Sequence, residues 1–270
     1  MGKTGNLIVK GGQLIDGTGS PSRPADVRIR DGIVVEVGPD LTPEGEERID
    51  ADGATVAPGF IDSHTHLDPS MFWDPACDPM PQHGVTTALI GNCSLSLAPV
   101  KPEHLEEVMD VFCYIEDMPI EEFRNGIPWS WQTWREYRNA MNERGAALNM
   151  ASLIGHSMLR IFVMGEDAWQ RAATPDEIGA MCDELRDALG AGCFGISTSF
   201  FDVDRQGRFV PSRLADRAEF EALAETLGRA GHGLVEFIPN FTGETPLEEM
   251  KQIAETLAPH GVTSIWNGLL

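Results

Sequence analysis

The chain has 270 residues, 42% of them hydrophobic and 23% charged, a length and composition typical of a globular protein with one large domain or one large and one small domain. Its formal net charge of -22 argues against a nucleic-acid partner, because phosphates are bound by Lys and Arg. No apolar run approaches the ~18 residues of a membrane span, and the N-terminus lacks the apolar core of a signal peptide, so we expect a cytoplasmic protein with no membrane partner.

Residues 1–57 are expected to form a small β-sandwich-like domain. Three short runs, Asn6–Lys10, Ala25–Arg30 and Ile33–Val37, are rich in β-forming residues and are separated by Gly and Pro. The pair Asp31 and Gly32 between the last two runs is typical of a tight hairpin turn.

Residues 58–270 are expected to form part of a (β/α) TIM-like barrel, an α/β fold. After Ala57, short apolar runs alternate with helical segments, which is typical of buried parallel strands joined by crossovers. The predicted strands are Phe60–His64, Val85–Ile90, Ala147–Ile154, Cys193–Ser197, Leu234–Ile238 and Val262–Trp266. A closed barrel has eight strands and about six are present, so we expect the chain to be truncated at its C-terminus.

Three crossover helices have recognisable ends. Thr174 and Thr245 each precede a Pro and are followed by a Glu at the third helical position, which is typical of a helix N-terminus. A third helix is predicted over Ala215–Arg229, with Gly231 after its end.

A long, partly helical excursion covers residues 102–145 and contains Trp129, Trp131 and Trp134. An insertion after a strand often shapes a substrate pocket. An aromatic patch that covers the barrel or contacts a second copy, as in a homo-oligomer, is an equally good interpretation.

Two histidines at the end of the first predicted barrel strand indicate a metal site. His64 and His66 are two residues apart, and in a strand such residues point to the same face. Two imidazoles so placed can bind one cation, and barrel active sites lie at the C-terminal ends of the strands. Asp68 follows the pair and is considered as a proton shuttle, although a structural role at the strand end is favoured.

Cys93 ends the second predicted strand and should lie beside the two histidines. A thiolate is a good Zn²⁺ ligand, so the position favours this role over that of a buried thiol. The chain has no CxxC pair, and a disulfide framework is not expected. The other cysteines are predicted to be buried thiols: Cys77, Cys113, Cys182 and Cys193.

Further polar residues follow the third and fourth strands. His156 is predicted to bind substrate or to orient a metal ligand, with a structural role equally plausible. Arg160 could hold a carboxylate, although a surface or interface role is favoured. Ser199, with Ser197 and Thr198, offers hydroxyls that could bind substrate at the barrel mouth. The simpler role for each of these hydroxyls is hydrogen bonding at the end of the strand. No Lys stands at a strand end, so a two-metal site bridged by a modified lysine is not expected.

Four segments together resemble the N-acyl-D-amino-acid deacylases (D-aminoacylases) of the amidohydrolase superfamily. They are APGFIDSHTHLD, GVTTALIGNCSLSLAP, LIGHSMLR and GISTSFF, within residues 5–200. The resemblance implies a zinc enzyme with a small β domain beside a distorted barrel, which hydrolyses N-acyl-D-amino acids to a carboxylate and a D-amino acid. Zn²⁺ would activate a water and polarise the carbonyl of this small-molecule substrate, and a carboxylate would move the proton.

The resemblance assigns part of a metal site to this chain. His64, His66 and Cys93 match zinc ligands of the family. The family also takes histidines from the fifth and sixth strands, where this chain has GLVEFIPNF without a histidine and Asn267 in SIWNG. His232 and His260 precede their strands and cannot replace them. The family's catalytic aspartate is expected beyond Leu270, so the catalytic residue is unknown here.

Three hypotheses follow from these patterns. The first is a zinc-dependent D-aminoacylase-like hydrolase. The second is an amidohydrolase that acts on a cyclic amide or another acyl group, which the missing histidines favour. The third is an inactive fragment or degenerate paralogue, which the missing strands and aspartate favour.

Overall fold

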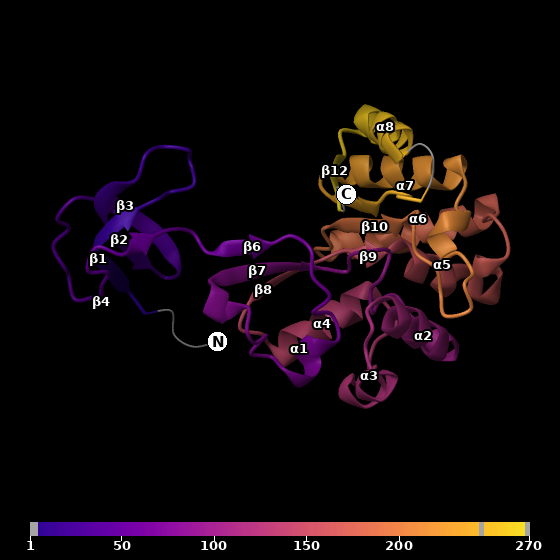
Figure 1. Cartoon of the computed structure of the whole chain (residues 1–270), viewed down its shortest axis with the longest axis horizontal. Coiled ribbons are helices and arrows are strands. Elements are labelled where there is room, and N and C mark those ends of the chain that lie inside the picture. The colour runs from indigo at the N-terminus through magenta and orange to yellow at the C-terminus, as the bar shows by residue number, and fades with distance from the viewer. Residues whose placement is uncertain (1–4, 243–245, 268–270) are drawn as a thin grey trace. The chain divides into compact units, whose positions relative to one another are not determined.

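The computed structural model describes residues 5–242 and 246–267 (Figure 1). Contacts between residues divide the chain into two compact units, one up to Phe60 and one from Ile61. Within the described residues, no helix has the length and apolar character needed to cross a membrane.

The first unit is built on one β-sheet in the order β3-β2-β1-β4, with β5 also paired to β1. Asp31 and Gly32, both at positive φ, form the predicted hairpin turn, so that Arg30 pairs with Ile33. A small apolar core contains Leu14, Ala25 and Val27. The strands are β1 (Leu7–Leu14), β2 (Arg23–Arg30), β3 (Ile33–Gly38), β4 (Glu47–Asp50) and β5 (Thr55–Val56).

The second unit contains two β-sheets. The larger sheet has the order β12-β11-β10-β9 with all pairs parallel, and the smaller has the order β6-β7-β8, with β7 and β8 parallel. The predicted α/β class with parallel strands is therefore confirmed. The strands are β6 (Phe60–Asp62), β7 (Val85–Ile90), β8 (Asn149–Ser152), β9 (Ile154–Gly155), β10 (Gly195–Ser199), β11 (Leu234–Ile238) and β12 (Thr263–Trp266).

Three of the predicted strands of the second unit differ from the structure by two residues or more, and one of them, Cys193–Ser197, is shifted to Gly195–Ser199. Ala147–Ile154 is not one strand, because the chain passes from β8 to β9 at Leu153 and so joins the two sheets. The first barrel strand is shorter than predicted and ends at Asp62, whose side chain accepts the His64 backbone N–H at 3.1 Å. The apolar run also predicts a buried strand, but Phe60 and Ile61 are exposed.

Helices join the strands of the second unit. Thr174 and Glu177 form the predicted capping box, and the third predicted helix begins at Arg217 after an Asp216 cap. The prediction for Thr245 lies outside the described residues. The helices are α1 (Ser70–Trp73), α2 (Leu105–Ile115), α3 (Ile120–Gly126), α4 (Trp134–Arg144), α5 (His156–Met164), α6 (Pro175–Gly190), α7 (Arg217–Ala230) and α8 (Pro246–Leu257).

The tryptophans of the excursion are part of the core. Trp131 and Trp134 are buried, and Trp131 stacks on Phe72 with 5.1 Å between ring centroids. Trp131 also donates to the Leu97 backbone oxygen at 2.7 Å, which ties the excursion to the segment after β7. Trp131 and Trp134 therefore fit the interpretation of an aromatic cluster that covers the fold better than that of a pocket wall.

Candidate metal centre

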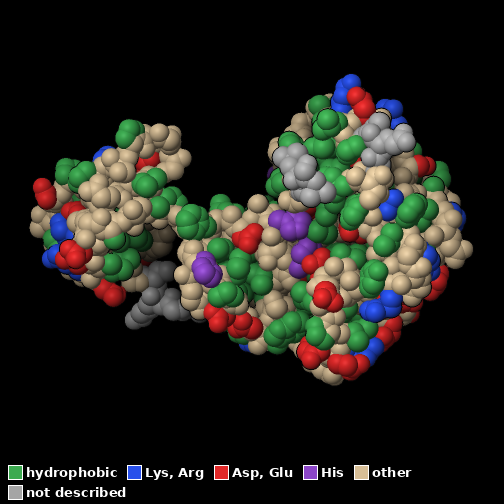
Figure 2. Space-filling model, viewed as in Figure 1, with side chains coloured by type: hydrophobic (Ala, Val, Ile, Leu, Met, Phe, Trp, Pro, Cys, Tyr) green, Lys and Arg blue, Asp and Glu red, His purple; other side chains and the backbone are tan. Residues whose placement is uncertain are grey.

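Three predicted ligands meet at one point between the smaller sheet and helix α2. The Nε2 atoms of His64 and His66 lie 3.1 Å and 3.2 Å from the Cys93 Sγ, and the two imidazole centroids are 5.3 Å apart. These three residues form the single group of at least three His, Cys, Asp or Glu side chains within metal-binding reach of one another in the described residues. Figure 2 shows histidines close together at the surface of the larger unit, bordered by acidic side chains.

The donor set fits a zinc ion. Nitrogen and sulfur ligands at Zn²⁺ distances of ~2.0–2.3 Å in a tetrahedron lie roughly 3.3–3.6 Å from one another. The observed separations of 3.1 Å and 3.2 Å are close to this range. Burial lowers the pKa of both histidines, that of His66 to about 3, so the imidazoles are neutral as metal ligands must be.

The backbone around Cys93 is held in a strained turn. Cys93 and Ser94 both have positive φ, at 56° and 67°, a conformation that costs a non-glycine residue about 1–3 kcal/mol. Two side chains from the larger sheet hold this turn: Glu236 accepts the Cys93 N–H at 3.0 Å, and Ser197 accepts the Ser94 N–H at 3.0 Å. The position of the thiol therefore depends on both sheets.

Carboxylates surround the three ligands, and of these the sequence indicates Asp68 but not Glu116, Glu236 or Asp202. A Glu116 oxygen lies 3.3 Å from the His66 Nε2, and a Glu236 oxygen lies 3.7 Å from the His64 Nδ1. Burial raises the pKa of Glu116, Glu236 and Asp68 to about 7, and it also raises that of Asp202. So many carboxylates in a buried place create a negative potential that favours a cation.

The Cys93 thiol responds to the same environment. Burial, followed by the charges of Glu236 and Glu116, raises its pKa far above the ordinary value. Without a cation the residue is a neutral thiol, and a divalent metal is what would stabilise the thiolate.

His156 lies away from the three ligands, in a buried polar network. Its Nδ1 contacts the Thr198 hydroxyl at 3.0 Å, and its Nε2 contacts Glu219 at 2.7 Å. Both ring nitrogens thus have partners within the protein. The contact between His156 and substrate stays a prediction, while a structural role accounts for its polar atoms.

Arg160 is fully buried, so its predicted surface role is wrong. Its guanidinium binds the Glu219 carboxylate and donates to the Arg171 backbone oxygen at 2.8 Å. The alternative prediction, that Arg160 binds a carboxylate, agrees with the structure, and the carboxylate is that of Glu219 in the protein itself.

Ser199 is buried at the end of β10. Its hydroxyl donates to Asp202 at 2.6 Å and accepts the backbone N–H groups of Phe201 and Asp202. These bonds shape the turn that carries Asp202 toward the metal centre. The contact between Ser199 and substrate stays a prediction.

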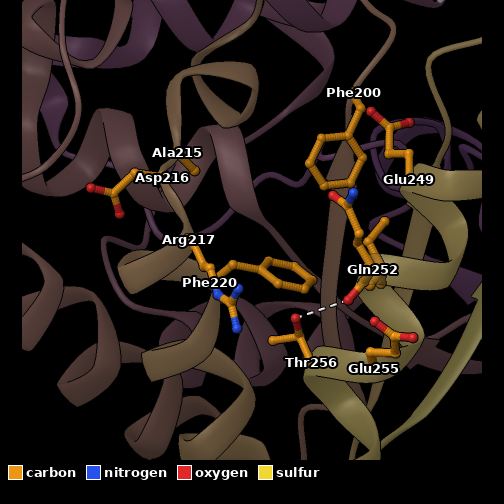
Figure 3. Close-up of a pocket in the computed structure, with 10 residues that line it drawn as sticks. Phe200, Ala215, Asp216, Arg217, Phe220, Glu249, Gln252, Glu255 and Thr256 are labelled. Carbon is orange, nitrogen blue, oxygen red and sulfur yellow. Dashed lines mark hydrogen bonds between the residues drawn. The ribbon is translucent and has the colours of Figure 1, made fainter. Parts of the chain in front are cut away.

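The second unit has several cavities, two of which have volumes of about 330 Å³ and 580 Å³. The one in Figure 3, about 330 Å³, lies between α7 and α8 and is lined by Phe200, Phe220, Glu249 and Gln252 among others, with none of the three ligands. The other, about 580 Å³, is also lined by none of the three ligands, although its wall includes Asp202 and Ile115, the residue before Glu116. Its lining residues are Tyr114, Ile115, Phe201, Asp202, Val203, Phe209, Arg213 and Thr242.

Comparison with known proteins places this chain in a family. The sequence model of the amidohydrolase family matches residues 47–269. The chain belongs to the amidohydrolase family. An N-acyl-D-aspartate deacylase from Alcaligenes xylosoxydans xylosoxydans is 38% identical over 227 residues, which are 84% of this chain and 42% of that protein.

Solved structures of amidohydrolases resemble this chain as well. A D-aminoacylase crystal structure superposes with a TM-score of 0.78 at 33% identity, covering 97% of this chain and 51% of that chain. An N-acyl-D-glutamate deacylase from Bordetella bronchiseptica, complexed with zinc and a phosphonate inhibitor, gives a TM-score of 0.77 at 28% identity, with 96% and 50% covered. The chain thus spans about half the length of these relatives.

Proposed function

We propose that the protein is a zinc-dependent hydrolase that cleaves the linear amide of an N-acyl-D-amino acid and releases a carboxylate and a D-amino acid. The observation that carries this proposal is the meeting of His64, His66 and Cys93 at one point. The named activity of the N-acyl-D-aspartate deacylase supports the substrate class, and the zinc in the N-acyl-D-glutamate deacylase supports the metal. We also infer that the two sheets belong to one (β/α) barrel, with residues 1–57 as a small β domain.

The chain's own residues suggest how amide hydrolysis would proceed. When bound to the three ligands, Zn²⁺ supplies a Lewis acid and lowers the pKa of a water. Glu116 lies at the metal-binding nitrogen of His66, where a carboxylate can take a proton from water and pass it to the leaving nitrogen. Its pKa of about 7 suits this exchange near neutral pH.

The cavity beside Glu116 is the proposed place for the substrate. Its aromatic walls, Tyr114, Phe201 and Phe209, suit an apolar acyl group or side chain. The Arg213 guanidinium, 3.6 Å from the centroid of the Phe209 ring, is the one cationic group of this wall in the described part of the chain. It suits the free carboxylate of an N-acyl amino acid.

A substrate panel tests the proposed reaction. We expect the zinc-loaded protein to hydrolyse N-acetyl-D-amino acids faster than the L-forms, to lose activity with a chelator and to regain it with Zn²⁺. Hydrolysis of a cyclic amide, with no hydrolysis of the D- or L-forms, would favour the second hypothesis, an amidohydrolase that acts on a cyclic amide. The absence of histidine from β11 supports that hypothesis. Release of free amine, followed by chromatography, is the measurement.

Replacing Glu116 with Gln is expected to lower turnover by about 10²-fold or more, because general acid–base groups contribute about 10²- to 10⁴-fold. The zinc content should stay the same, since Glu116 is not among the three proposed ligands. Glu121→Gln is the matched control, because Glu121 pairs with Arg124 at an exposed position. Turnover of Glu116→Gln within twofold of the wild type would exclude the proton-transfer role.

A further inference from the structure

Glu236 lies behind two of the three proposed ligands. It is in the middle of β11, and its side chain is fully buried. One carboxylate oxygen accepts the backbone N–H of Cys93 at 3.0 Å, and the other lies 3.7 Å from the Nδ1 of His64. A single carboxylate from the larger sheet thus reaches both segments of the smaller sheet that carry ligands.

The imidazole of His64 lies between Cys93 on one side and Asn267 and Glu236 on the other. Its Nε2 faces the Cys93 Sγ at 3.1 Å, while its Nδ1 contacts the Asn267 amide and lies 3.7 Å from a Glu236 oxygen, beyond hydrogen-bond distance. An imidazole that binds a cation through Nε2 carries its proton on Nδ1. A carboxylate near that side favours this tautomer electrostatically and makes the ligand more basic.

Asn267 supports Glu236 from the end of β12. Its Nδ2 donates to the Glu236 oxygen that faces His64, at 2.7 Å, and the same amide contacts the His64 Nδ1. The fifth and sixth predicted strands therefore contribute to the metal centre through an acid and an amide behind His64.

The surroundings of Glu236 point to a cation. Among residues 5–242 and 246–267, the Glu236 carboxylate has His64 as its one basic neighbour within 4.0 Å. A buried carboxylate without a counterion costs several kcal/mol. A divalent metal on the other side of His64 would offset that cost.

We propose that Glu236 is the positioning residue of the metal centre. It is not a ligand. It acts on His64 by its charge, 3.7 Å from Nδ1, and through the Asn267 amide that it binds. It also holds Cys93 through the backbone and supplies negative charge that strengthens binding of a divalent cation. This inference rests on the metal site of the proposed function.

The change Glu236→Gln separates charge from shape. Glutamine keeps an oxygen that can accept the Cys93 N–H and has nearly the volume of glutamate. We expect the Kd of the chain for Zn²⁺, measured by competition with a chromophoric chelator, to rise about 10- to 100-fold. The melting temperature of the metal-free protein should not fall, because the variant no longer buries an uncompensated charge.

A spectrum and two further variants sharpen the test. With Co²⁺ in place of Zn²⁺, the thiolate charge-transfer band should persist in Glu236→Gln, while the ligand-field bands shift because His64 is less firmly oriented. Glu236→Asp should recover part of the affinity that Gln loses. Glu225→Gln, which removes an exposed partner of Arg229 on α7, should leave the Kd unchanged.

Three results would overturn the proposal. A Kd for Glu236→Gln within twofold of the wild type would show that the carboxylate does not support the site. Two cations per wild-type chain and one per Glu236→Gln chain would make Glu236 a ligand of a second ion. A wild-type chain that binds no divalent cation would overturn the proposed function and this inference together.

Discussion

Replacing Cys93 with Ala is expected to weaken Zn²⁺ binding by about 10²- to 10³-fold. Binding of structural zinc by four ligands is worth ~10–16 kcal/mol, so one ligand contributes roughly 3–4 kcal/mol. Cys93 also contacts both histidine nitrogens, at 3.1 Å and 3.2 Å, and is thus the centre of the group. Titration calorimetry with Zn²⁺ would measure the loss.

Cys182→Ala is the matched control for this change. Cys182 is also a buried free thiol, but it lies on α6 and is not among the three ligands. The control variant should bind Zn²⁺ as the wild type does. Equal Zn²⁺ affinity in Cys93→Ala and Cys182→Ala would remove Cys93 from the metal site.

Replacing Glu219 with Ala is expected to lower the free energy of unfolding by about 3–5 kcal/mol, because removal of one partner leaves a buried charge uncompensated. Glu219 contacts the Nε2 of His156 at 2.7 Å and binds the guanidinium of Arg160, and all three side chains are buried. Urea unfolding followed by circular dichroism would give the difference.

The exposed residue Glu221 on the same helix provides the control. It pairs with Arg217 at the surface, so Glu221→Ala should change the free energy of unfolding by less than about 0.5 kcal/mol. If the Glu219 and Glu221 variants were equally stable, the buried network would not be a major source of stability.

The Glu219 network also predicts a pH dependence. Burial alone would raise the pKa of Glu219, but the hydrogen bonds and charges of His156 and Arg160 outweigh burial and lower it below 4.5. A lowered folded-state pKa adds stability above the unfolded value, and this stability is lost as the pH falls through the folded value. The difference in unfolding free energy between wild type and Glu219→Ala should therefore shrink on acidification below about pH 4.5.

The sequence predicts those parts of the metal centre that come from residues close in the chain or from the ends of neighbouring parallel strands. His64 and His66 are close in the chain, and Cys93 follows β7, which pairs with β6. The two histidines do not lie in the strand, because β6 ends at Asp62, so strand alternation does not orient their rings. A turn closed by the Asp62 side chain brings them together instead.

Contacts between distant segments could not be predicted in the same way. Glu236 is 143 residues from Cys93, and its one sequence signal is a lone charge within the apolar strand LVEFI. Glu116 directly follows α2, a helix that contains other acidic residues, and no sequence pattern distinguishes it from them. Arg160 is predicted at the surface because arginine is usually exposed, and its partner Glu219 is 59 residues away.

X-ray absorption at the zinc edge tests most directly whether His64, His66 and Cys93 together hold the metal. The chain loaded with one Zn²⁺ should show one sulfur ligand at about 2.3 Å and two imidazole nitrogens at about 2.0–2.1 Å, the remaining scattering coming from oxygen. A zinc shell of oxygen and nitrogen without sulfur, or a chain that retains no zinc after dialysis, would contradict this metal centre.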